Sequence, residues 1–270
     1  MNPHPLARSV PPAGPLAGVG VIVTRPARQA AGFARKLAVL DAAPLIFPAI
    51  VILPPADRDA LDRAHADLAH YAAVVFVSAN AVEYGAPDAS RWPPKLAAFV
   101  PGPGTAEALA DVGIVNVRIP ATTYDSEGLL ALPQLTHVRG QRIAIFRGDG
   151  GREVLGTTLT ERGARVDYVE CYRRAAPTSG SGLAEALRDG RAHALTLTSS
   201  EGADNLWAVL DAEARAALGR LPTFAPHPRI AGRARDLSLN AIETSGGDAG
   251  LIAGLLEWFA SHPVHTHKAR

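Results

Sequence analysis

Hydroxyl and amide side chains stand directly after two short apolar runs of this 270-residue chain. Ser78 and Asn80 follow the run VVFV, and Ser199 and Ser200 follow the run LTLT. In a parallel sheet such positions fall at the carboxyl end of a strand, where the next helix begins with unpaired N–H groups and a partial positive charge. These residues can simply cap helices, but the same groups also bind carboxylates. Their occurrence at two places predicts a site for an anionic small molecule.

Three arginines are candidates for pairing with carboxylates of such a ligand. Arg25 ends the block GVGVIVTR, Arg147 ends the block GQRIAIFR, and Arg229 lies in the segment PHPRI. A guanidinium can bind a carboxylate through two parallel hydrogen bonds. A surface arginine without a ligand looks the same in a sequence, so both interpretations stay open.

Two glycine-rich turns would let the backbone approach a ligand closely. The segment PGPGT contains Gly102 and Thr105, and the segment RGDGG begins its glycine run at Gly148. Glycine has no Cβ to hold a ligand away from the backbone. The PGPGT turn matches neither the phosphate loop nor the dinucleotide fingerprint, so nucleotide binding is weakly supported. For the RGDGG turn, the alternative is a plain loop.

A tyrosine is the best candidate for acid chemistry. Tyr172 adjoins Cys171 in the strand-like run Val166–Tyr172, and alternation along a strand places these two side chains on opposite faces. A phenol can donate a hydrogen bond to a leaving oxygen at neutral pH. Cys171 is predicted to be an inert core residue, and Tyr172 could equally be a packed aromatic. The chain lacks a glycosidase carboxylate pair, a G-x-S-x-G elbow and an H-E-x-x-H helix.

The segments that position these residues occur twice. Gly18 begins a block that recurs at Gly140, and Gly128 begins one that recurs at Gly250, with nearly the same offset. Between them VVFVS recurs as LTLTS, and FVPGPGTA recurs as FAPHPRIA. A constant offset of this kind indicates two copies of one folding unit.

Each copy alternates short apolar runs with helical patterns, which is typical of parallel sheets covered by helices. The sequence therefore predicts an α/β fold of two similar lobes with mainly parallel sheets flanked by helices, and a ligand cleft between the lobes. Strands are expected at Val19–Thr24, Val74–Val77 and Leu195–Thr198. Pro48 makes Leu45–Ile52 an expected extended linker, because proline is poorly tolerated in central strands.

Composition argues against several classes of protein. The net charge is +1 and the basic residues are spread along the chain, which argues against partners such as nucleic acid or a membrane surface. One cysteine allows no internal disulfide, and no apolar run is long enough to span a membrane, so a cytoplasmic protein is expected. Residues 1–15 are expected to be a disordered lead-in and 262–270 a loose tail. No metal site is predicted, although the tail contains His262, His265 and His267.

Several short motifs, taken in order and spacing, resemble those of the uroporphyrinogen-III synthase family over about residues 17–260. They are VIVTRP, VFVSANAVE, VPGPGTAEAL, FRGDGGRE, VECYRR and TSSEGADNL. The resemblance implies an enzyme that closes hydroxymethylbilane to uroporphyrinogen III, with loss of water and inversion of ring D through a spiro intermediate. It also implies that no metal or organic cofactor is needed.

The resemblance further implies a discontinuous domain made of residues 16–48 and 177–261, an inserted domain of residues 49–176, and a two-stranded linker between them. Tyr172 matches the tyrosine that the family offers as proton donor to the departing hydroxyl. The residues that the resemblance places around the substrate carboxylates are Ser78, Asn80, Ala81, Gly102, Thr105, Ser199 and Ser200. Arg25, Arg147, Gly148 and Arg229 are further candidates for substrate binding.

A monomer is expected, with transient contact to the deaminase that supplies the substrate. One departure is that His227 and Arg229 stand where many relatives carry Gly-Pro-Thr-Thr, so Arg229 would replace a hydroxyl contact. His227 is expected to be a loop histidine rather than a catalytic one. The alternatives are a non-catalytic two-lobed protein that binds an anionic small molecule, and a catalytically inactive relative with a regulatory role.

Overall fold

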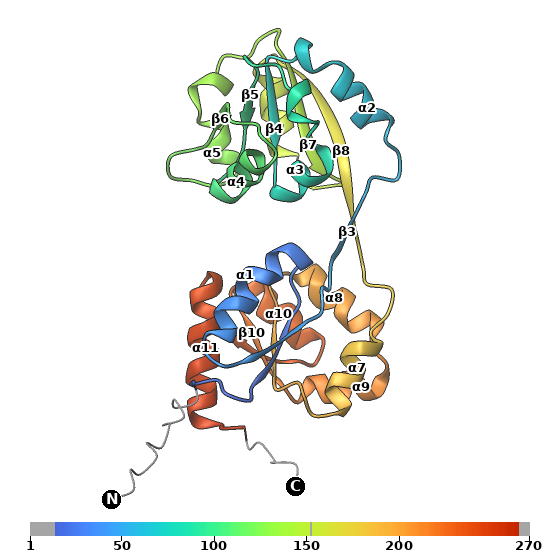
Figure 1. The fold of residues 1–270 in the computed structure, drawn as a ribbon, viewed down its shortest axis with the longest axis vertical. Coiled ribbons are helices and arrows are strands. Elements are labelled where there is room, and N and C mark those ends of the chain that lie inside the picture. Colours follow the sequence, from blue (N-terminus) through green and yellow to red (C-terminus); the bar gives the residue numbers. More distant parts are fainter. Residues whose placement is uncertain (1–13, 152, 265–270) are drawn as a thin grey trace, which may run out of the picture. The chain divides into compact units, whose positions relative to one another are not determined.

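The computed structural model describes residues 14–151 and 153–264. Contacts divide the chain into two units: unit 1 contains the chain up to Val51 and from Ala176 on, and unit 2 runs from Ile52 to Ala175. The chain passes from unit 1 to unit 2 at β3 and returns after β8 (Figure 1). Most of the expected lead-in, and the tail from His265 on, lie outside the described residues.

Unit 1 contains a five-stranded parallel sheet with the strand order β11-β10-β9-β1-β2. Its strands are β1 (Gly20–Val23), β2 (Ala43–Ile46), β9 (Ala194–Thr196), β10 (Pro222–Ala225) and β11 (Asn240–Glu243). Its helices are α1 (Ala27–Ala38), α7 (Ser181–Arg188), α8 (Ser200–Val209), α9 (Ala212–Gly219), α10 (Pro228–Asp236) and α11 (Gly247–Ser261).

The continuous apolar run of β1 is explained by burial on both faces of this sheet. Val21 and Val23 pack on one side against α1 and α11, in a cluster that includes Phe33 and Leu255. Ile22 points to the other side, into a cluster built from α7, α8, α9 and α10. Helices therefore cover both faces of the sheet, as Figure 1 shows.

Unit 2 contains a six-stranded sheet with the order β3-β8-β7-β4-β5-β6, in which the pairs from β8 to β6 are parallel. Its strands are β3 (Val51–Leu53), β4 (Ala73–Phe76), β5 (Ala97–Phe99), β6 (Val117–Arg118), β7 (Arg142–Gly148) and β8 (Arg165–Ala175). Its helices are α2 (Asp59–Ala66), α3 (Ala79–Gly85), α4 (Pro103–Asp111), α5 (Ser126–Leu130) and α6 (Val154–Glu161), with 3-10 turns η1 (Leu68–His70), η2 (Ala89–Arg91) and η3 (Pro133–Leu135). No helix in the described parts of the chain is long and apolar enough to cross a membrane.

The sequence repeat is also a structural repeat. By the matching sequence blocks, β7 is equivalent to β1, β4 to β9, and β5 to β10. With that correspondence the sheet order β11-β10-β9-β1-β2 of unit 1 becomes β6-β5-β4-β7-β8 of unit 2. The predicted α/β fold with mainly parallel sheets flanked by helices is confirmed.

The segment expected to be a linker, Leu45–Ile52, is in part a sheet strand. Leu45 and Ile46 belong to β2, which pairs in parallel with β1. The strand also contains Pro44, and it tolerates this residue because β2 lies at the edge of the sheet, where one side needs no hydrogen-bond donors. Pro48 itself follows β2, and the chain leaves unit 1 after Val51, within the segment that was expected to be the linker.

At the start of β1, the side chain of His193 accepts a backbone hydrogen bond that it can accept only when Nδ1 is unprotonated. The Gly20 N–H donates to Nδ1 of His193 at 2.8 Å, which requires that nitrogen to be unprotonated. Burial lowers the pKa of His193. The unfolded chain therefore binds the proton more readily than the folded chain, so the stability that this histidine contributes is present above its unfolded pKa, about 6.5, and decreases below it.

We expect His193→Asn to reduce the loss of stability in acid, because the asparagine Oδ1 accepts the same hydrogen bond without titrating. Urea unfolding followed between about pH 7.5 and about pH 5 checks this, since that range spans the unfolded histidine pKa. The control His137→Asn, at an exposed position, should keep the wild-type pH slope. Equal slopes for His193→Asn and wild type would contradict the assignment.

Candidate functional site

Ser78 stands at the carboxyl edge of the unit 2 sheet, between β4 and α3. Its Oγ accepts a hydrogen bond from the Ala81 N–H at 3.1 Å and so caps α3. Asn80 lies in the same first turn. The backbone donor of Ala81 is therefore already used by the cap, while the hydroxyl proton of Ser78 is left for another partner.

That partner is Tyr172 of β8. Its phenol oxygen lies 3.3 Å from Ser78 Oγ, and the residue is 8% exposed. The ring lies against Gly148, where a Cβ would come within 2.6 Å of Tyr172 Cε2. The sheet thus brings together Ser78, Gly148 and Tyr172, three residues that are far apart in the sequence.

A bulge in β8 produces this placement. Glu170 pairs with Arg147, and Tyr172 pairs with Gly148, so β8 carries one extra residue, Cys171, at this point. Bulges of this kind redirect side chains and are frequent beside active sites.

The expectation that Cys171 and Tyr172 face opposite sides is wrong. Both are buried in the same core cluster, because the bulge interrupts the alternation of the strand. The Cys171 thiol contacts the Arg147 carbonyl oxygen at 3.3 Å, and burial raises the pKa of the thiol to about 12. Its predicted role as an inert core residue fits this environment.

A cavity of about 150 Å³ adjoins Tyr172 within unit 2. Arg147 lies in its wall and is 6% exposed. The guanidinium donates through Nε to the Gly150 carbonyl at 3.1 Å, pairs with Glu153 at 3.1 Å, and lies 4.8 Å from the centre of the Tyr168 ring. Arg147 is thus held by internal partners and places positive charge beside the cavity. The other lining residues are Val77, Ser126, Ile145, Gly148, Gly151, Leu155, Tyr172 and Arg174.

Sequence reasoning missed Tyr168 and Glu153. The Tyr168 hydroxyl donates to Glu153 Oε2 at 3.2 Å, and burial followed by this bond raises the pKa of the phenol. Tyr168 precedes Tyr172 on the same strand, and Glu153 follows the RGDGG turn by two residues, so proximity to predicted residues was the available signal.

Gly102 and Thr105 open α4 at the neighbouring strand end of unit 2. Gly102 is the residue before the helix, and its carbonyl accepts the Thr105 N–H at 3.2 Å. A Cβ at Gly102 would lie 3.2 Å from the Cβ of Tyr124, so glycine lets that side chain lie close to the turn. Thr105 is buried at 8% exposure.

The equivalent edge of unit 1 presents Ser199 and Ser200. Ser199 Oγ accepts the Gly202 N–H at 2.9 Å and caps α8 as Ser78 caps α3. Ser200 Oγ is buried and has no hydrogen-bond partner among the described residues. Because buried hydroxyls are nearly always paired, this atom is suited to a ligand.

Arg25, after β1, is already paired. It contacts Asp248 at 2.6 Å and lies 4.6 Å from the centre of the Phe33 ring. Burial alone would raise the pKa of Asp248, but hydrogen bonds from Lys36 and Arg25 outweigh it and lower that pKa. The sequence could not show this internal partner, because Asp248 is distant in the chain.

Arg229, in contrast, is exposed in the first turn of α10. Its N–H donates to Nδ1 of His227 at 3.1 Å, so His227 caps α10. This contact gives the loop histidine a structural role and leaves the Arg229 guanidinium at the surface.

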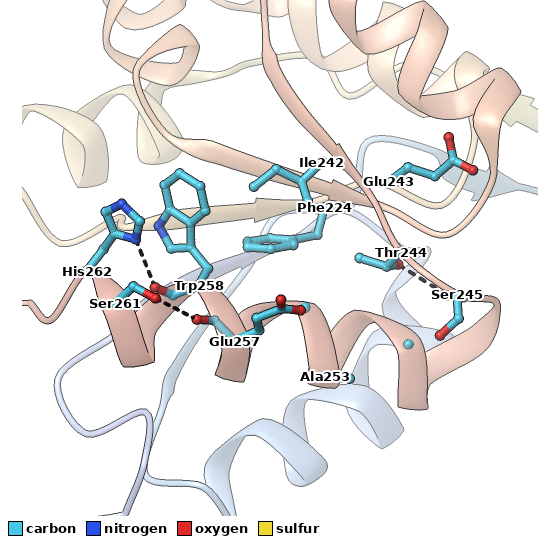
Figure 2. Close-up of a pocket in the computed structure, with 12 residues that line it drawn as sticks. Phe224, Ile242, Glu243, Thr244, Ser245, Ala253, Glu257, Trp258, Ser261 and His262 are labelled. Carbon is cyan, nitrogen blue, oxygen red and sulfur yellow. Dashed lines mark hydrogen bonds between the residues drawn. The ribbon is translucent and has the colours of Figure 1, made fainter.

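A second cavity, of about 560 Å³, lies in unit 1 beside α11 (Figure 2). Figure 2 shows Trp258 and His262 at one end and Thr244 and Ser245 at the other. Some of its polar groups bond to each other: Thr244 Oγ1 donates to the Ser245 carbonyl at 3.1 Å. None of the sequence-predicted site residues lines it.

Within residues 14–151 and 153–264, no group of three or more His, Cys, Asp and Glu side chains is placed to hold a metal ion. Of the tail histidines, His262 is among the described residues, and His265 and His267 are outside them.

Comparison with known proteins identifies one family. A model of the family described as uroporphyrinogen-III synthase HemD matches residues 31–247. The uroporphyrinogen-III synthase of Salmonella typhimurium is 34% identical over 197 residues, which cover 71% of this chain and 80% of the relative. That of Escherichia coli is 33% identical over 199 residues, with the same coverage of 71% and 80%.

Solved structures show a similar fold. The uroporphyrinogen-III synthetase of Helicobacter pylori has a TM-score of 0.58 at 12% identity and covers 89% of this chain and 99% of its own. A mutant uroporphyrinogen III synthase of Thermus thermophilus has a TM-score of 0.53 at 19% identity, with coverage of 90% and 99%.

We expect Gly148→Ala to lower the free energy of unfolding by about 1 to 3 kcal/mol, because the new methyl group displaces the buried Tyr172 ring. Urea denaturation measures the change. Gly182→Ala is the control: no atom lies within 4 Å of the place that its Cβ would occupy, and alanine has a higher helix propensity than glycine, so that variant should be as stable as wild type or more so. Equal stability of Gly148→Ala and wild type would show that the ring is not held against Gly148.

Proposed function

The chain belongs to the uroporphyrinogen-III synthase family, and we propose that Tyr172 donates the proton to the departing hydroxyl of its substrate. The activity is that of a cyclising lyase of tetrapyrrole biosynthesis, which converts hydroxymethylbilane to uroporphyrinogen III. The relatives described above are named as synthases, so a non-catalytic binding protein is not favoured.

The observation that carries the proposed role is the placement of the Tyr172 phenol. It lies at the carboxyl edge of a parallel sheet, the usual place for ligands in this class of fold, and it adjoins a cavity. Ser78 lies within hydrogen-bonding distance, and Arg147 supplies positive charge on the cavity wall. The thiol of Cys171 is too well buried and too firmly protonated to compete as the reactive group.

The reaction requires the protein to donate a proton and to orient the two ends of the substrate. When the phenol protonates the hydroxyl on ring A, water leaves and the pyrrole becomes an electrophilic azafulvene. Attack by the already substituted carbon of ring D gives the spiro intermediate that leads to inversion. Closure without inversion occurs spontaneously, so holding the two chain ends in the spiro orientation decides which isomer forms.

We propose that donors at the strand ends bind the eight carboxylates of the substrate. Two observations support this: Ser200 Oγ is buried without a partner among the described residues, and the Arg229 residue is exposed. Arg25 and Arg147 would act through their charge, since both already have carboxylate partners. The complete set of proposed substrate-binding residues is Arg25, Ser78, Asn80, Ala81, Gly102, Thr105, Arg147, Gly148, Ser199, Ser200 and Arg229.

The substrate is a small molecule, and we propose that the chain acts on it as a cytoplasmic monomer that receives it from the preceding deaminase. The nearly balanced charge of the chain, +1, supports a function without nucleic acid or membrane partners. Its one cysteine is a buried free thiol, as is common in reducing compartments.

The function is tested by supplying hydroxymethylbilane, generated in place by the deaminase, and separating the oxidised products by isomer. The III isomer should dominate with wild-type protein, and Tyr172→Phe should slow its formation about 10- to 100-fold, less than the roughly 100- to 10,000-fold typical of general acid catalysis because the substrate reacts spontaneously. Exclusive formation of the I isomer by wild type would refute the activity.

The matched control is Tyr84→Phe, since this neighbouring hydroxyl donates to the Ile52 carbonyl at 3.1 Å instead of approaching Ser78. Its rate should remain close to that of wild type. If Tyr172→Phe were as fast as this control, Tyr172 would have no part in the mechanism.

Ser200→Ala tests the proposed carboxylate contact separately. The variant should be at least as stable as wild type, because it removes a buried hydroxyl without a partner among the described residues. Its KM should rise about tenfold, the effect of losing one charge-assisted hydrogen bond of about 1.4 kcal/mol. Ser199→Ala, by comparison, removes a helix cap and should lower the free energy of unfolding by about 1 kcal/mol. An unchanged KM for Ser200→Ala would exclude this hydroxyl from binding.

A further inference from the structure

Ser78 has two hydrogen-bonding neighbours, and one of them can only donate to it. The Ala81 N–H donates to Ser78 Oγ at 3.1 Å, and Tyr172 OH lies 3.3 Å from the same oxygen. A backbone N–H cannot accept, so the cap uses a lone pair of Ser78 and leaves its proton available. When Ser78 donates that proton to the phenol oxygen, the Tyr172 proton is free to point elsewhere.

We propose that Ser78 is a positioning residue for catalysis, which directs the Tyr172 O–H toward the substrate and stabilises the phenolate that forms when the proton leaves. The inference rests on the proposed role of Tyr172 as proton donor. It gives the Ser78 hydroxyl a function through Tyr172, and it leaves the proposed contact of Ser78 with a substrate carboxylate to the backbone N–H, which Ser78→Gly would keep.

The ring of Tyr172 is fixed on other sides, which leaves the hydroxyl direction to Ser78. Gly148 lies directly against the ring, and the Tyr84 ring has its centre 6.3 Å away. These contacts set the position of the phenol oxygen but not the rotation of its O–H bond. Among the described residues, Ser78 is the hydrogen-bonding neighbour of that oxygen.

The proton-transfer step balances. The Tyr172 O–H bond breaks and its proton joins the hydroxyl oxygen of ring A, while the C–O bond breaks with its electron pair and water leaves. Electrons from the pyrrole nitrogen form the azafulvene as a cation that keeps its N–H proton, and the phenolate keeps the hydrogen bond from Ser78. A hydrogen bond to a charged oxygen is stronger than one to a neutral oxygen, so this contact favours the charged state. The proton that the product loses on regaining its aromatic rings returns to the phenolate.

The repeat supplies an internal comparison. Ser199 stands at the equivalent strand end and caps α8 through the Gly202 N–H at 2.9 Å. In the part of the chain that the structure describes, no tyrosine hydroxyl bonds to Ser199. The cap is therefore common to both copies, and the pairing with a phenol belongs to the copy that contains Tyr172.

The test separates capping from donation with two substitutions. Ser78→Thr keeps the cap and the hydroxyl proton, whereas Ser78→Gly removes the hydroxyl but remains an acceptable N-cap residue. We expect Ser78→Gly to lower kcat for the III isomer about tenfold with little change in KM, and Ser78→Thr to recover most of that loss. Asp211→Gly, which removes the equivalent cap of α9, should leave kcat unchanged.

The same substitution is then made in the Tyr172→Phe background. Without the phenol, Ser78→Gly should produce no further fall in kcat. An equal fall in both backgrounds, a rise in KM alone, or a Ser78→Gly enzyme with wild-type kcat would each overturn the positioning role. Failure of the proposed function is a different result: Tyr172→Phe itself would then retain the wild-type rate.

Discussion

The extra residue that β8 carries opposite β7 determines where the candidate acid lies. Without it, Tyr172 would alternate with Cys171, and only one of them would face the core shared by β4 and α3. With it, both side chains are buried on the same side, and the Tyr172 ring meets Gly148 and Ser78. The bulge is possible because Gly148 has no Cβ at the position that the ring occupies. The glycine, the bulge and the tyrosine therefore depend on one another, and a change in any of them moves the phenol.

The duplication gives the two units equivalent strand ends, and at both ends an arginine is paired with a carboxylate of its own unit. Arg25 follows β1 and Arg147 is the residue before the last of β7, and these two strands are equivalent. Each guanidinium lies over an aromatic ring and pairs with a carboxylate, Asp248 in unit 1 and Glu153 in unit 2. A guanidinium that is largely withdrawn from water needs such a counter-charge, whatever ligand the site takes. These residues therefore organise the loops at the strand ends and add a local positive charge, rather than standing as free anion-binding groups.

The sequence predicted the parts of the fold that depend on local pattern. Continuous apolar runs identified β1, β4 and β9, and small polar residues after them identified the starts of α3 and α8. It could not predict the features that depend on pairing between distant segments: the register shift at Cys171, the internal partners of Arg25 and Arg147, and the place of Glu153 in the cavity network. The strand at Leu45 and Ile46 was missed for the same reason, since β2 lies at a sheet edge and a proline in a strand, such as Pro44, is acceptable where no neighbour needs its missing donor.

The two helix caps explain how equal local structure leads to unequal chemistry. Ser78 and Ser199 each accept one backbone hydrogen bond, because a helix start needs an acceptor, and each keeps its hydroxyl proton for another partner. In unit 2 that proton lies beside Tyr172, since β8 is the neighbour of β7 and its bulge turns the ring toward β4. In unit 1 the corresponding neighbour of β1 is β2, a four-residue edge strand with the sequence APLI, which has no tyrosine. The asymmetry of the site thus arises from the strands that follow the repeated blocks, and not from the capping residues themselves.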